Sequence, residues 1–383
     1  MTRIAITADV HADDYSWARV DPETGMNARF NDMVGTARWV AAEARARDAE
    51  VLVMCGDYTE SKVPARAPRA AKIARAFDAG PDVQVHLRGN HDAEWAGDSI
   101  VSLLERTRLW SGFTVPGIRE LADVAICAIP YLDRKYARVL PGMEGLTDAA
   151  LYARLREEYL DIARGHFALA MKRGPRQAIL VGHQQLAGSD MTDSQRSFLG
   201  DLDLVVDARA LSEIGFAAVV MGHVHRAQEV VAAGGAASGP VLYAGSQERV
   251  DFAEEHEAKS FVILELGPSG LTSVERIDIP ARRFVTLRSG AFDPEAVAGA
   301  VVRAVDLEPS IDRALLRHDL EAAGAFAVTG VEVARPQRHA TPAARAIADA
   351  GSPDQQLVAA LAGDPDADRL LARGREFMTE EAT

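Results

Sequence analysis

The chain has 383 residues, of which 48% are hydrophobic and 26% are charged, and its formal net charge is −14. This composition is ordinary for a globular protein, and the length leaves room for one large core and one or two small appendages. The acidic surplus argues against a protein that coats nucleic acid with a broad basic surface, although it does not exclude a local cationic pocket.

The sequence also bears on the compartment. No apolar run approaches the roughly 20 residues that a membrane-spanning helix needs, and residues 1–3 lead directly into an apolar strand-like segment without the features of a secretory signal. We therefore expect a cytoplasmic protein that has no membrane association. Cys55 and Cys127 each lie in an apolar segment, which favours buried free thiols over a disulfide.

Short apolar runs recur through the first 250 residues, and nearly all of them end in a polar turn that contains glycine. Such runs are typical of buried strands. The predicted strands cover residues 4–7, 51–55, 83–87, 124–129, 178–181, 217–221 and 241–244. Helical spacing of apolar residues predicts helices at residues 29–47, 66–77 and 148–171. The alternation of strand and helix predicts an α/β core.

The pattern changes after residue 259. An apolar run over residues 261–266, a Gly-Pro-Ser-Gly turn and a second run over residues 271–279 predict an antiparallel hairpin that closes the core. Pro280 follows this hairpin. We therefore expect the first domain to cover residues 1–280.

Two appendages are expected beyond Pro280. Residues 281–336 are predicted to form a small α/β capping domain. Its expected elements are an apolar strand, a helix and a further apolar stretch, at residues 284–287, 294–305 and 326–333. Residues 337–383 are alanine-rich, and Gly-Ser-Pro and Gly-Asp-Pro turns interrupt their helix-like pieces, which predicts a helical tail.

Five short polar motifs follow the predicted strands. They are Asp9-Val10-His11, Gly56-Asp57, Gly89-Asn90-His91-Asp92, Gly182-His183 and Gly222-His223-Val224-His225. Asp-x-His or Gly-Asp alone is more typical of a turn or a helix cap, and Gly-Asn-His-Asp alone suits a tight turn. Gly-His-x-His alone suits a ligand pair and a pair of surface histidines equally. Open α/β sheets bind ligands at the carboxyl ends of their strands, so all five motifs are expected to meet at one place. Their joint appearance indicates a metal site.

The spacing within the motifs suits a centre with two metal ions. Residues two apart in an extended segment project to the same side, so Asp9 with His11 and His223 with His225 can each act as a pair. Such a centre needs a bridging carboxylate, which Asp57 is expected to supply. Oxygen and nitrogen donors without thiolate suit Mn²⁺, Fe²⁺ or, less well, Zn²⁺. Manganese is the expected metal, and two divalent ions would make the pocket cationic enough for a phosphate ester.

The order of these motifs resembles that of the calcineurin-like metallophosphoesterase superfamily. Within it, the stretch Tyr-Ala-Gly-Ser-Gln-Glu-Arg-Val-Asp-Phe at residues 243–252, followed by Glu254 and by Lys-Ser-Phe at residues 259–261, resembles the SbcD-type DNA repair nucleases. The resemblance covers about residues 1–280. It implies a four-layer α/β/β/α sandwich with a small α/β cap and a helical C-terminal tail.

The resemblance also implies a role for each motif residue. Two sets of metal ligands would have Asp57 in common: Asp9, His11, Asp57 and His225 for one ion, and Asp57, Asn90, His183 and His223 for the other. His91 would not bind metal and would protonate the leaving 3′ oxygen, a role that the near-neutral pKa of histidine suits. Glu60 stands where some relatives place a histidine or an aspartate near the scissile phosphate.

The function that the resemblance implies is a manganese-dependent exo- and endonuclease acting on DNA ends. The chain has no Gly-x-x-x-x-Gly-Lys-[Ser/Thr] phosphate loop, so ATP use would come from a partner, which in this family is an SbcC-type coiled-coil ATPase. A stand-alone metallophosphodiesterase for small nucleotides and a non-catalytic scaffold for DNA or the ATPase are the alternatives. Whether the chain forms a homodimer stays open.

The tail is the candidate docking segment for this ATPase. Leu370, Leu371, Phe377 and Met378 recur at a spacing that places them on one stripe of a helix. Such a stripe can fold back on its own domain or dock into the groove of a partner. The sequence favours neither alternative by itself.

Overall fold

The computed structural model describes residues 1–60, 67–92, 100–101, 110–138, 142–143, 145–192, 195, 204–234, 239–333, 352–362 and 366–380. The chain divides into two compact units. One comprises Met1–Val305 and Asp312–Val331, and the other comprises Asp306–Ile311 and Glu332–Thr383. No helix in these described ranges combines the length and the apolar character that crossing a membrane requires.

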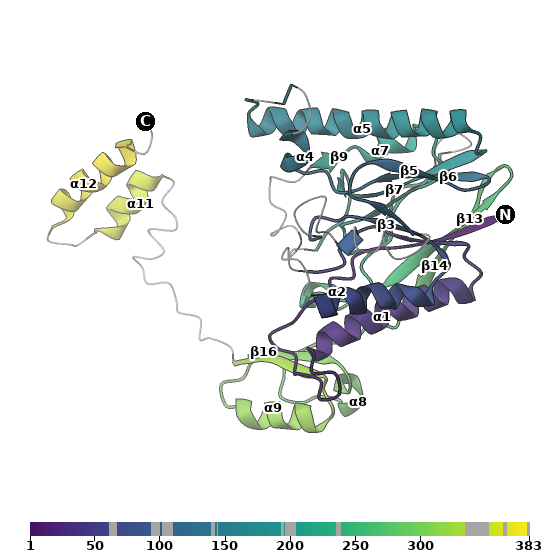
Figure 1. Ribbon diagram of the computed structural model, residues 1–383. Coiled ribbons are helices and arrows are strands. Elements are labelled where there is room, and N and C mark those ends of the chain that lie inside the picture. Colours follow the sequence, from purple (N-terminus) through teal and green to yellow (C-terminus); the bar gives the residue numbers. More distant parts are fainter. Residues whose placement is uncertain are drawn as a thin grey trace. The chain divides into compact units, whose positions relative to one another are not determined.

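Two six-stranded sheets form the centre of the larger unit (Figure 1). The first has the order β14-β13-β1-β2-β3-β4, in which β1 to β4 are parallel and β13 and β14 form an antiparallel hairpin on β1. Its strands are β1 (Thr2–Thr7), β2 (Val51–Met54), β3 (Val83–Leu87), β4 (Trp110–Phe113), β13 (Ser260–Gly267) and β14 (Gly270–Asp278). The predicted closing hairpin is confirmed.

The second sheet has the order β11-β12-β10-β7-β6-β5. Its four central strands are parallel, and β11 and β5 pair antiparallel at the two edges. Its strands are β5 (Gly117–Glu120), β6 (Val124–Ile129), β7 (Gln177–His183), β10 (Val219–Gly222), β11 (Gln228–Val231) and β12 (Val241–Tyr243). Parallel strands place their carboxyl ends at one edge, and the polar motifs follow these ends.

Side-chain alternation along the strands builds the layers. Ile4 and Ile6 of β1 lie in an apolar cluster shared by the two sheets, whereas Ala5 between them packs with residues of the helix α1. The helices α1 (Ala28–Ala46) and α2 (Ala67–Ala76) cover the first sheet, and α5 (Asp148–Arg173) and α7 (Ala208–Ser212) cover the second (Figure 1). The predicted α/β/β/α order is confirmed.

Local chemistry sets the ends of the long helices. The side chain of Asn27 accepts hydrogen bonds from the backbone N–H groups of the first residues of α1. Thr147 caps α5 in the same way, and Gly174, at φ 120°, ends it. Both predicted cysteine environments are confirmed, since Cys55 and Cys127 are buried and free.

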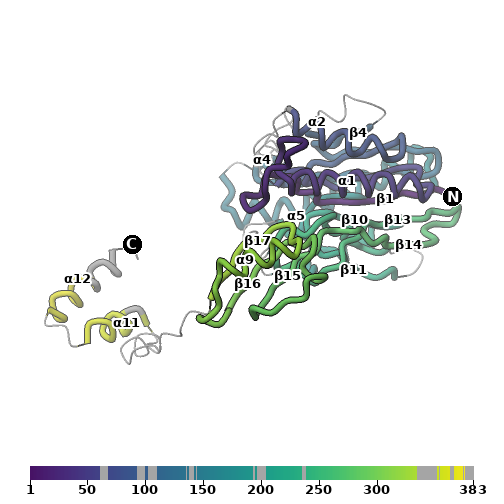
Figure 2. The backbone as a smooth tube through the Cα atoms, turned by 90° about the horizontal axis from the view of Figure 1, so that it is seen from below, coloured from purple at the N-terminus to yellow at the C-terminus, as the bar shows by residue number. Residues whose placement is uncertain are grey.

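The segment after residue 280 contains a three-stranded sheet, β15-β16-β17 (Figure 2). Its elements are β15 (Phe284–Leu287), α8 (Pro294–Val297), β16 (Val301–Leu307), α9 (Arg313–Ala322) and β17 (Ala327–Val333). The small α/β character is therefore confirmed. The boundary at residue 280 stays a prediction about domain organisation.

The helix predicted at residues 294–305 is wrong. It ends at Val297, and the chain then turns at Gly299, whose φ of 69° favours glycine. Val301 and Val302 continue as β16 and pair in parallel with β15. These β-branched side chains are buried in a sheet, where they pack better than in a helix. The helix α9 was not predicted.

Two helices form the described part of the tail, α11 (Pro353–Ala360) and α12 (Ala367–Glu380). Ser352 caps α11 by accepting a hydrogen bond from the backbone N–H of Gln355. Arg375 of α12 forms an ion pair with Asp354 of α11, at 2.5 Å, so the two helices contact each other. Leu370, on the predicted apolar stripe, is 38% exposed.

Candidate metal centre

The predicted site residues lie at the ends of five parallel strands or in the loops that follow them, three strands being from one sheet and two from the other. Those of the first sheet follow β1, β2 and β3: Asp9, His11, Asp57, Asn90 and His91. Those of the second sheet end or follow β7 and β10: His183, His223 and His225. Side chains of the two groups lie within 3.2 Å of each other, for example Asp57 and His183. All five motifs therefore meet at one place, as their position at strand ends predicts.

The backbone at the site is unusual. Among the described residues, six other than glycine have positive φ, and four of these are Asp9, His11, Asp57 and His223, at 55°, 49°, 58° and 94°. Such conformations cost free energy and persist where the surrounding structure enforces them, often at functional sites. Asp9, His11 and His223 are therefore not in extended backbone, so the predicted extended geometry of the Asp9–His11 and His223–His225 pairs is wrong.

Two glycines allow the loops to approach one another. A Cβ atom on Gly89 would lie 2.1 Å from Oδ1 of Asp57, and one on Gly222 would lie 2.5 Å from the carbonyl oxygen of Cys55. Both distances are far inside van der Waals contact. The glycine that precedes the polar residues in these motifs is therefore needed for close packing of the loops.

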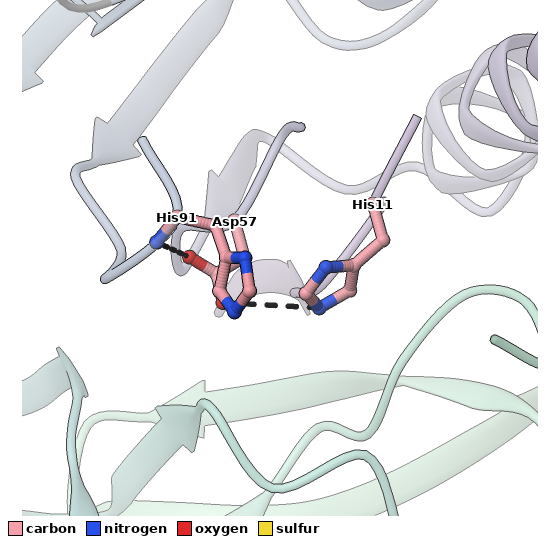
Figure 3. A group of neighbouring side chains, drawn as sticks. All are labelled: His11, Asp57 and His91. Carbon is pink, nitrogen blue, oxygen red and sulfur yellow. Dashed lines mark hydrogen bonds and ion pairs between the residues drawn. The ribbon is translucent and has the colours of Figure 1, made fainter. Parts of the chain in front are cut away.

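Asp57 lies at the middle of the site (Figure 3). Its Oδ2 atom is 3.2 Å from Nε2 of His183 and 3.7 Å from Nε2 of His11, and its Oδ1 atom accepts a hydrogen bond from the backbone N–H of His91 at 2.8 Å. Two groups of potential metal ligands contain it: His11, Asp57 and His91, and Asp57, His183 and His223, with ligand atoms within 4.8 Å of one another in each group. Asp57 is thus placed as a bridging residue would be.

Asn90 joins the second of these groups. Its Oδ1 atom lies 2.9 Å from Nε2 of His183 and 2.9 Å from Nδ1 of His223. With Asp57 this gives two oxygen and two nitrogen donors from four residues, the predicted second ligand set. Such a donor set suits divalent transition metals.

The surroundings of His183 show that the site needs a cation. Its Nδ1–H donates to the carbonyl oxygen of Cys55, and its Nε2 faces the oxygens of Asp57 and Asn90. Both ring nitrogens therefore face acceptors, so that either a proton or a metal ion must lie on the Nε2 side. Burial lowers the pKa of His183, but Asp57 and the other acceptors outweigh this effect and raise it to about 9.

His11 has the same character. Its Nδ1 lies 2.6 Å from a carboxylate oxygen of Glu60, and its Nε2 faces both Asp57 and Nε2 of His225, the latter at 2.9 Å. Burial lowers the pKa of His11, and the carboxylates of Glu60, Asp57 and Asp9 together raise it to about 10. Lone pairs of two imidazoles at this separation repel each other unless a cation is shared. The described residues therefore fit a centre for divalent ions.

Asp9 is fully buried beside the histidines of the second sheet. Its carboxylate accepts hydrogen bonds from the backbone N–H of His223 at 3.1 and 3.2 Å, and it lies 3.9 Å from Nδ1 of His183. The predicted ligand therefore also fixes the loop after β10. Its place in the first ligand set stays a prediction.

His91 is half-buried at the edge of the centre. Its Nδ1–H donates to the carbonyl oxygen of Glu60 at 2.5 Å, and its ring centre lies 5.1 Å from that of His11. Burial lowers the pKa of His91 from its usual value, although the Asp57 carboxylate opposes this. The ring is close enough to the other ligands to bind metal, so its predicted role as a general acid rests on the resemblance.

Some residues of the site were not predicted. The carboxylate of Asp92 accepts hydrogen bonds from the backbone N–H groups of Asp57, Tyr58 and Gly89, and the ring of Tyr131 lies 5.7 Å from that of His223. Asp92 stands inside a quoted motif, which was a usable signal. Nothing in the local sequence of Tyr131 indicates its position.

Comparison with protein families gives one match. Residues 2–227 match the family model described as calcineurin-like phosphoesterase. This segment covers more than half of the 383 residues and contains all five motifs.

Several solved structures are similar to the chain. One is a purple acid phosphatase from yellow lupin (Lupinus luteus) seeds, with 12% identity and a TM-score of 0.43, over 69% of this chain and 49% of that one. Another is a dimetal phosphatase from Danio rerio, with 11% identity and a TM-score of 0.44, over 73% of this chain and 98% of that one. A protein of Thermus thermophilus has 12% identity and a TM-score of 0.41, over 72% and 98%. The chain thus spans about half the length of the lupin enzyme.

Proposed function

The chain belongs to the calcineurin-like phosphoesterase family, and we propose that within this family it is a two-metal nuclease that hydrolyses phosphodiester bonds at DNA ends. Members of the family use two divalent metal ions and hydrolyse phosphoesters. The observation that carries the proposal is the position of Asp57, which belongs to both groups of potential ligands.

Two ligand sets are proposed, as the motif order implies. They are Asp9, His11, Asp57 and His225 for one ion, and Asp57, Asn90, His183 and His223 for the other. When bound, such ions act as Lewis acids toward the phosphate and lower the pKa of water. Manganese is the proposed metal, because the donors are oxygen and nitrogen atoms without thiolate.

His91 is proposed as the general acid for the leaving 3′ oxygen. The carbonyl oxygen of Glu60 holds its Nδ1–H, so that Nε2 is the nitrogen left to take up and release a proton. A general acid in this position contributes roughly 10²–10⁴-fold to the rate. Glu60 itself is proposed to lie near the substrate phosphate, since its side chain is 37% exposed while it contacts His11.

DNA is the proposed substrate because residues 243–261 resemble the corresponding stretch of SbcD-type nucleases. The test is hydrolysis of linear duplex DNA with Mn²⁺, beside bis-p-nitrophenyl phosphate and cyclic nucleotides, with Asp57→Asn protein purified identically as the control for contaminating nucleases. We expect DNA degradation that EDTA and Asp57→Asn both abolish. Hydrolysis of the small substrates alone would indicate a stand-alone phosphodiesterase, and loss of all hydrolysis in metal-loaded protein would indicate a scaffold.

An SbcC-type coiled-coil ATPase is the proposed partner, and its proposed docking segment is the pair of helices α11 and α12. The support is the amphipathic pattern of α12 and the exposure of Leu370 and Val358, at 38% and 43%. A DNA substrate and an ATPase of this kind would place the protein in the cytoplasm. Size-exclusion chromatography with light scattering distinguishes a homodimer from a monomer.

A further inference from the structure

His225 is held at both its ring and its main chain by residues that follow the matched family segment, residues 2–227. Its Nδ1–H donates to Oε1 of Glu254, at 2.7 Å. Its carbonyl oxygen accepts a hydrogen bond from the backbone N–H of Ser246 at 3.0 Å, and Nζ of Lys259 lies 3.5 Å from the same oxygen. One segment of 14 residues, 246–259, thus makes three contacts with this histidine, one to the ring and two to the carbonyl oxygen.

A buried ion pair supports the contact with the ring. Glu254 and Lys259 are 1% and 2% exposed, and Nζ of Lys259 lies 2.7 Å from Oε2 of Glu254. Buried charges are stable only when they are paired and hydrogen-bonded. The ammonium group also contacts Ser246 Oγ at 2.9 Å and Glu257 Oε2 at 3.0 Å, and Oε2 of Glu254 accepts from the backbone N–H of Val250 at 3.2 Å.

The two carboxylate oxygens of Glu254 therefore have different hydrogen-bond partners. Oε2 accepts hydrogen bonds from the ammonium group of Lys259 and from a backbone N–H, two groups that can only donate. Oε1 is therefore left for the ring of His225. With its hydrogen on Nδ1, a neutral imidazole has its lone pair on Nε2. That nitrogen is the one that faces His11, at 2.9 Å.

From this geometry we infer that Glu254 and Lys259 form a positioning pair for His225. Lys259 neutralises the buried Glu254 carboxylate and holds it in place, and Glu254 fixes the imidazole of His225 in the tautomer whose free lone pair points into the metal centre. This inference rests on the proposed function, in which His225 is a metal ligand. Partners of this kind orient a ligating histidine and increase its basicity.

The other histidines have different ring partners. Nδ1 of His183 donates to the backbone carbonyl of Cys55, which no side-chain substitution removes. The Glu60 side chain, which contacts His11, is 37% exposed and meets solvent, whereas the Glu254 side chain is 1% exposed. Glu254 is thus a buried side-chain partner that a substitution can remove.

The decisive variant is Glu254→Gln. Its amide has one oxygen, and Lys259 together with the N–H of Val250 requires an acceptor at the Oε2 position. The amide NH₂ then faces Nδ1 of His225 and selects the tautomer with its hydrogen on Nε2. Glu257→Gln is the matched control, since Glu257 contacts the same ammonium at 3.0 Å, whereas Nδ1 of His225 bonds to Glu254.

Two measurements test the pair. The first is ¹⁵N NMR of the histidine rings in metal-free protein, where we expect Glu254→Gln to move the His225 hydrogen from Nδ1 to Nε2 and Glu257→Gln to leave it in place. The second is calorimetric titration with Mn²⁺, where we expect the affinity for one of two ions to fall roughly 10–100-fold in Glu254→Gln only. Glu254→Asp keeps the charge that pairs with Lys259 but shortens the side chain, so it should lower the affinity for the same ion. This variant replaces Glu254→Gln if the glutamine variant fails to fold.

The outcomes separate the inference from the proposed function. An unchanged His225 tautomer in Glu254→Gln, or equal Mn²⁺ affinities in both glutamine variants, would overturn the positioning pair while two bound ions in the wild type still support the metal centre. A wild-type protein that binds no Mn²⁺ would overturn the proposed function. In that case the tautomer measurement alone decides whether the pair orients the ring.

Discussion

Arg29→Met is expected to destabilise the protein substantially, because Arg29 is fully buried and joins α1 to residues 248–249. Its guanidinium group pairs with Asp32 within α1, lies 3.1 Å from Oε2 of Glu248 and donates to the carbonyl oxygen of Arg249 at 2.7 Å. Methionine has a similar length and no charge. The substitution therefore removes the ionic contacts and keeps most of the packing.

The size of the destabilisation depends on the carboxylates that lose Arg29 as a partner. Removing one partner of a buried ion pair costs about 3–5 kcal/mol, because the other charge stays buried. Glu248 is 1% exposed but keeps hydrogen bonds from Thr36 Oγ1 at 2.7 Å and from the backbone N–H of Arg282 at 3.0 Å. Asp32 keeps its ion pair with the Arg282 side chain. These remaining donors favour the lower end, about 3 kcal/mol.

Urea unfolding of metal-free protein, followed by circular dichroism, measures this loss without the stabilisation that bound ions add. In the double variant Arg29→Met/Glu248→Gln the unpaired charge is gone, so we expect it to recover at least about 1 kcal/mol of the loss, the net contribution of one typical hydrogen bond. A single variant within about 0.5 kcal/mol of the wild type, the range of ordinary surface substitutions, would refute the reasoning. A double variant less stable than the single one would do the same.

Four further predictions concern the centre and the tail. His91→Asn should keep two bound ions and lose roughly 10²–10⁴-fold in DNA cleavage; near-normal turnover would remove its role as the acid. Asp57→Asn should bind fewer than two ions by elemental analysis, whereas His11→Ala should weaken mainly the binding of one ion. Full occupancy of both metal positions in Asp57→Asn would exclude a bridging role for Asp57. Because the pKa values of His11 and His183 are raised to about 10 and about 9 in metal-free protein, both rings are protonated at pH 7, so metal binding should release protons and tighten as the pH rises toward 9. Calorimetry in buffers of different ionisation enthalpy detects this release, and its absence contradicts the prediction. A chain without residues 337–383 should retain Mn²⁺-dependent cleavage but no longer co-purify with the ATPase; unchanged binding would place docking elsewhere.

The sequence predicted the core and the location of the site because both depend on local patterns. Apolar runs mark buried strands. Polar residues two or three positions after Thr7, Met54 and Leu87 must lie at the carboxyl edge of a parallel sheet. The order of the motifs then suffices to bring them together. No knowledge of the strand order within the sheets was needed.

Predictions failed where distant contacts decide the outcome. Residues 301–307 have a pattern that suits either a helix or a strand, and pairing with β15 selects the strand. The contact between Glu254 and His225 joins side chains 29 positions apart, and the one between Arg29 and Glu248 joins side chains 219 positions apart. Charge alone does not indicate such partners, since most glutamates and arginines are solvated.

The distribution of the proposed ligands over two sheets has a consequence for the order of events during synthesis. Residues 9–91 supply one half of the centre and residues 183–225 the other, while β1 needs β13, at residues 260–267, before its sheet is complete. A nascent chain that extends past residue 225 but has not reached residue 260 therefore has both sets of side chains but lacks the strand that flanks β1. We accordingly expect metal loading to follow emergence of the whole core from the ribosome, so that an incomplete chain does not carry a complete metal centre.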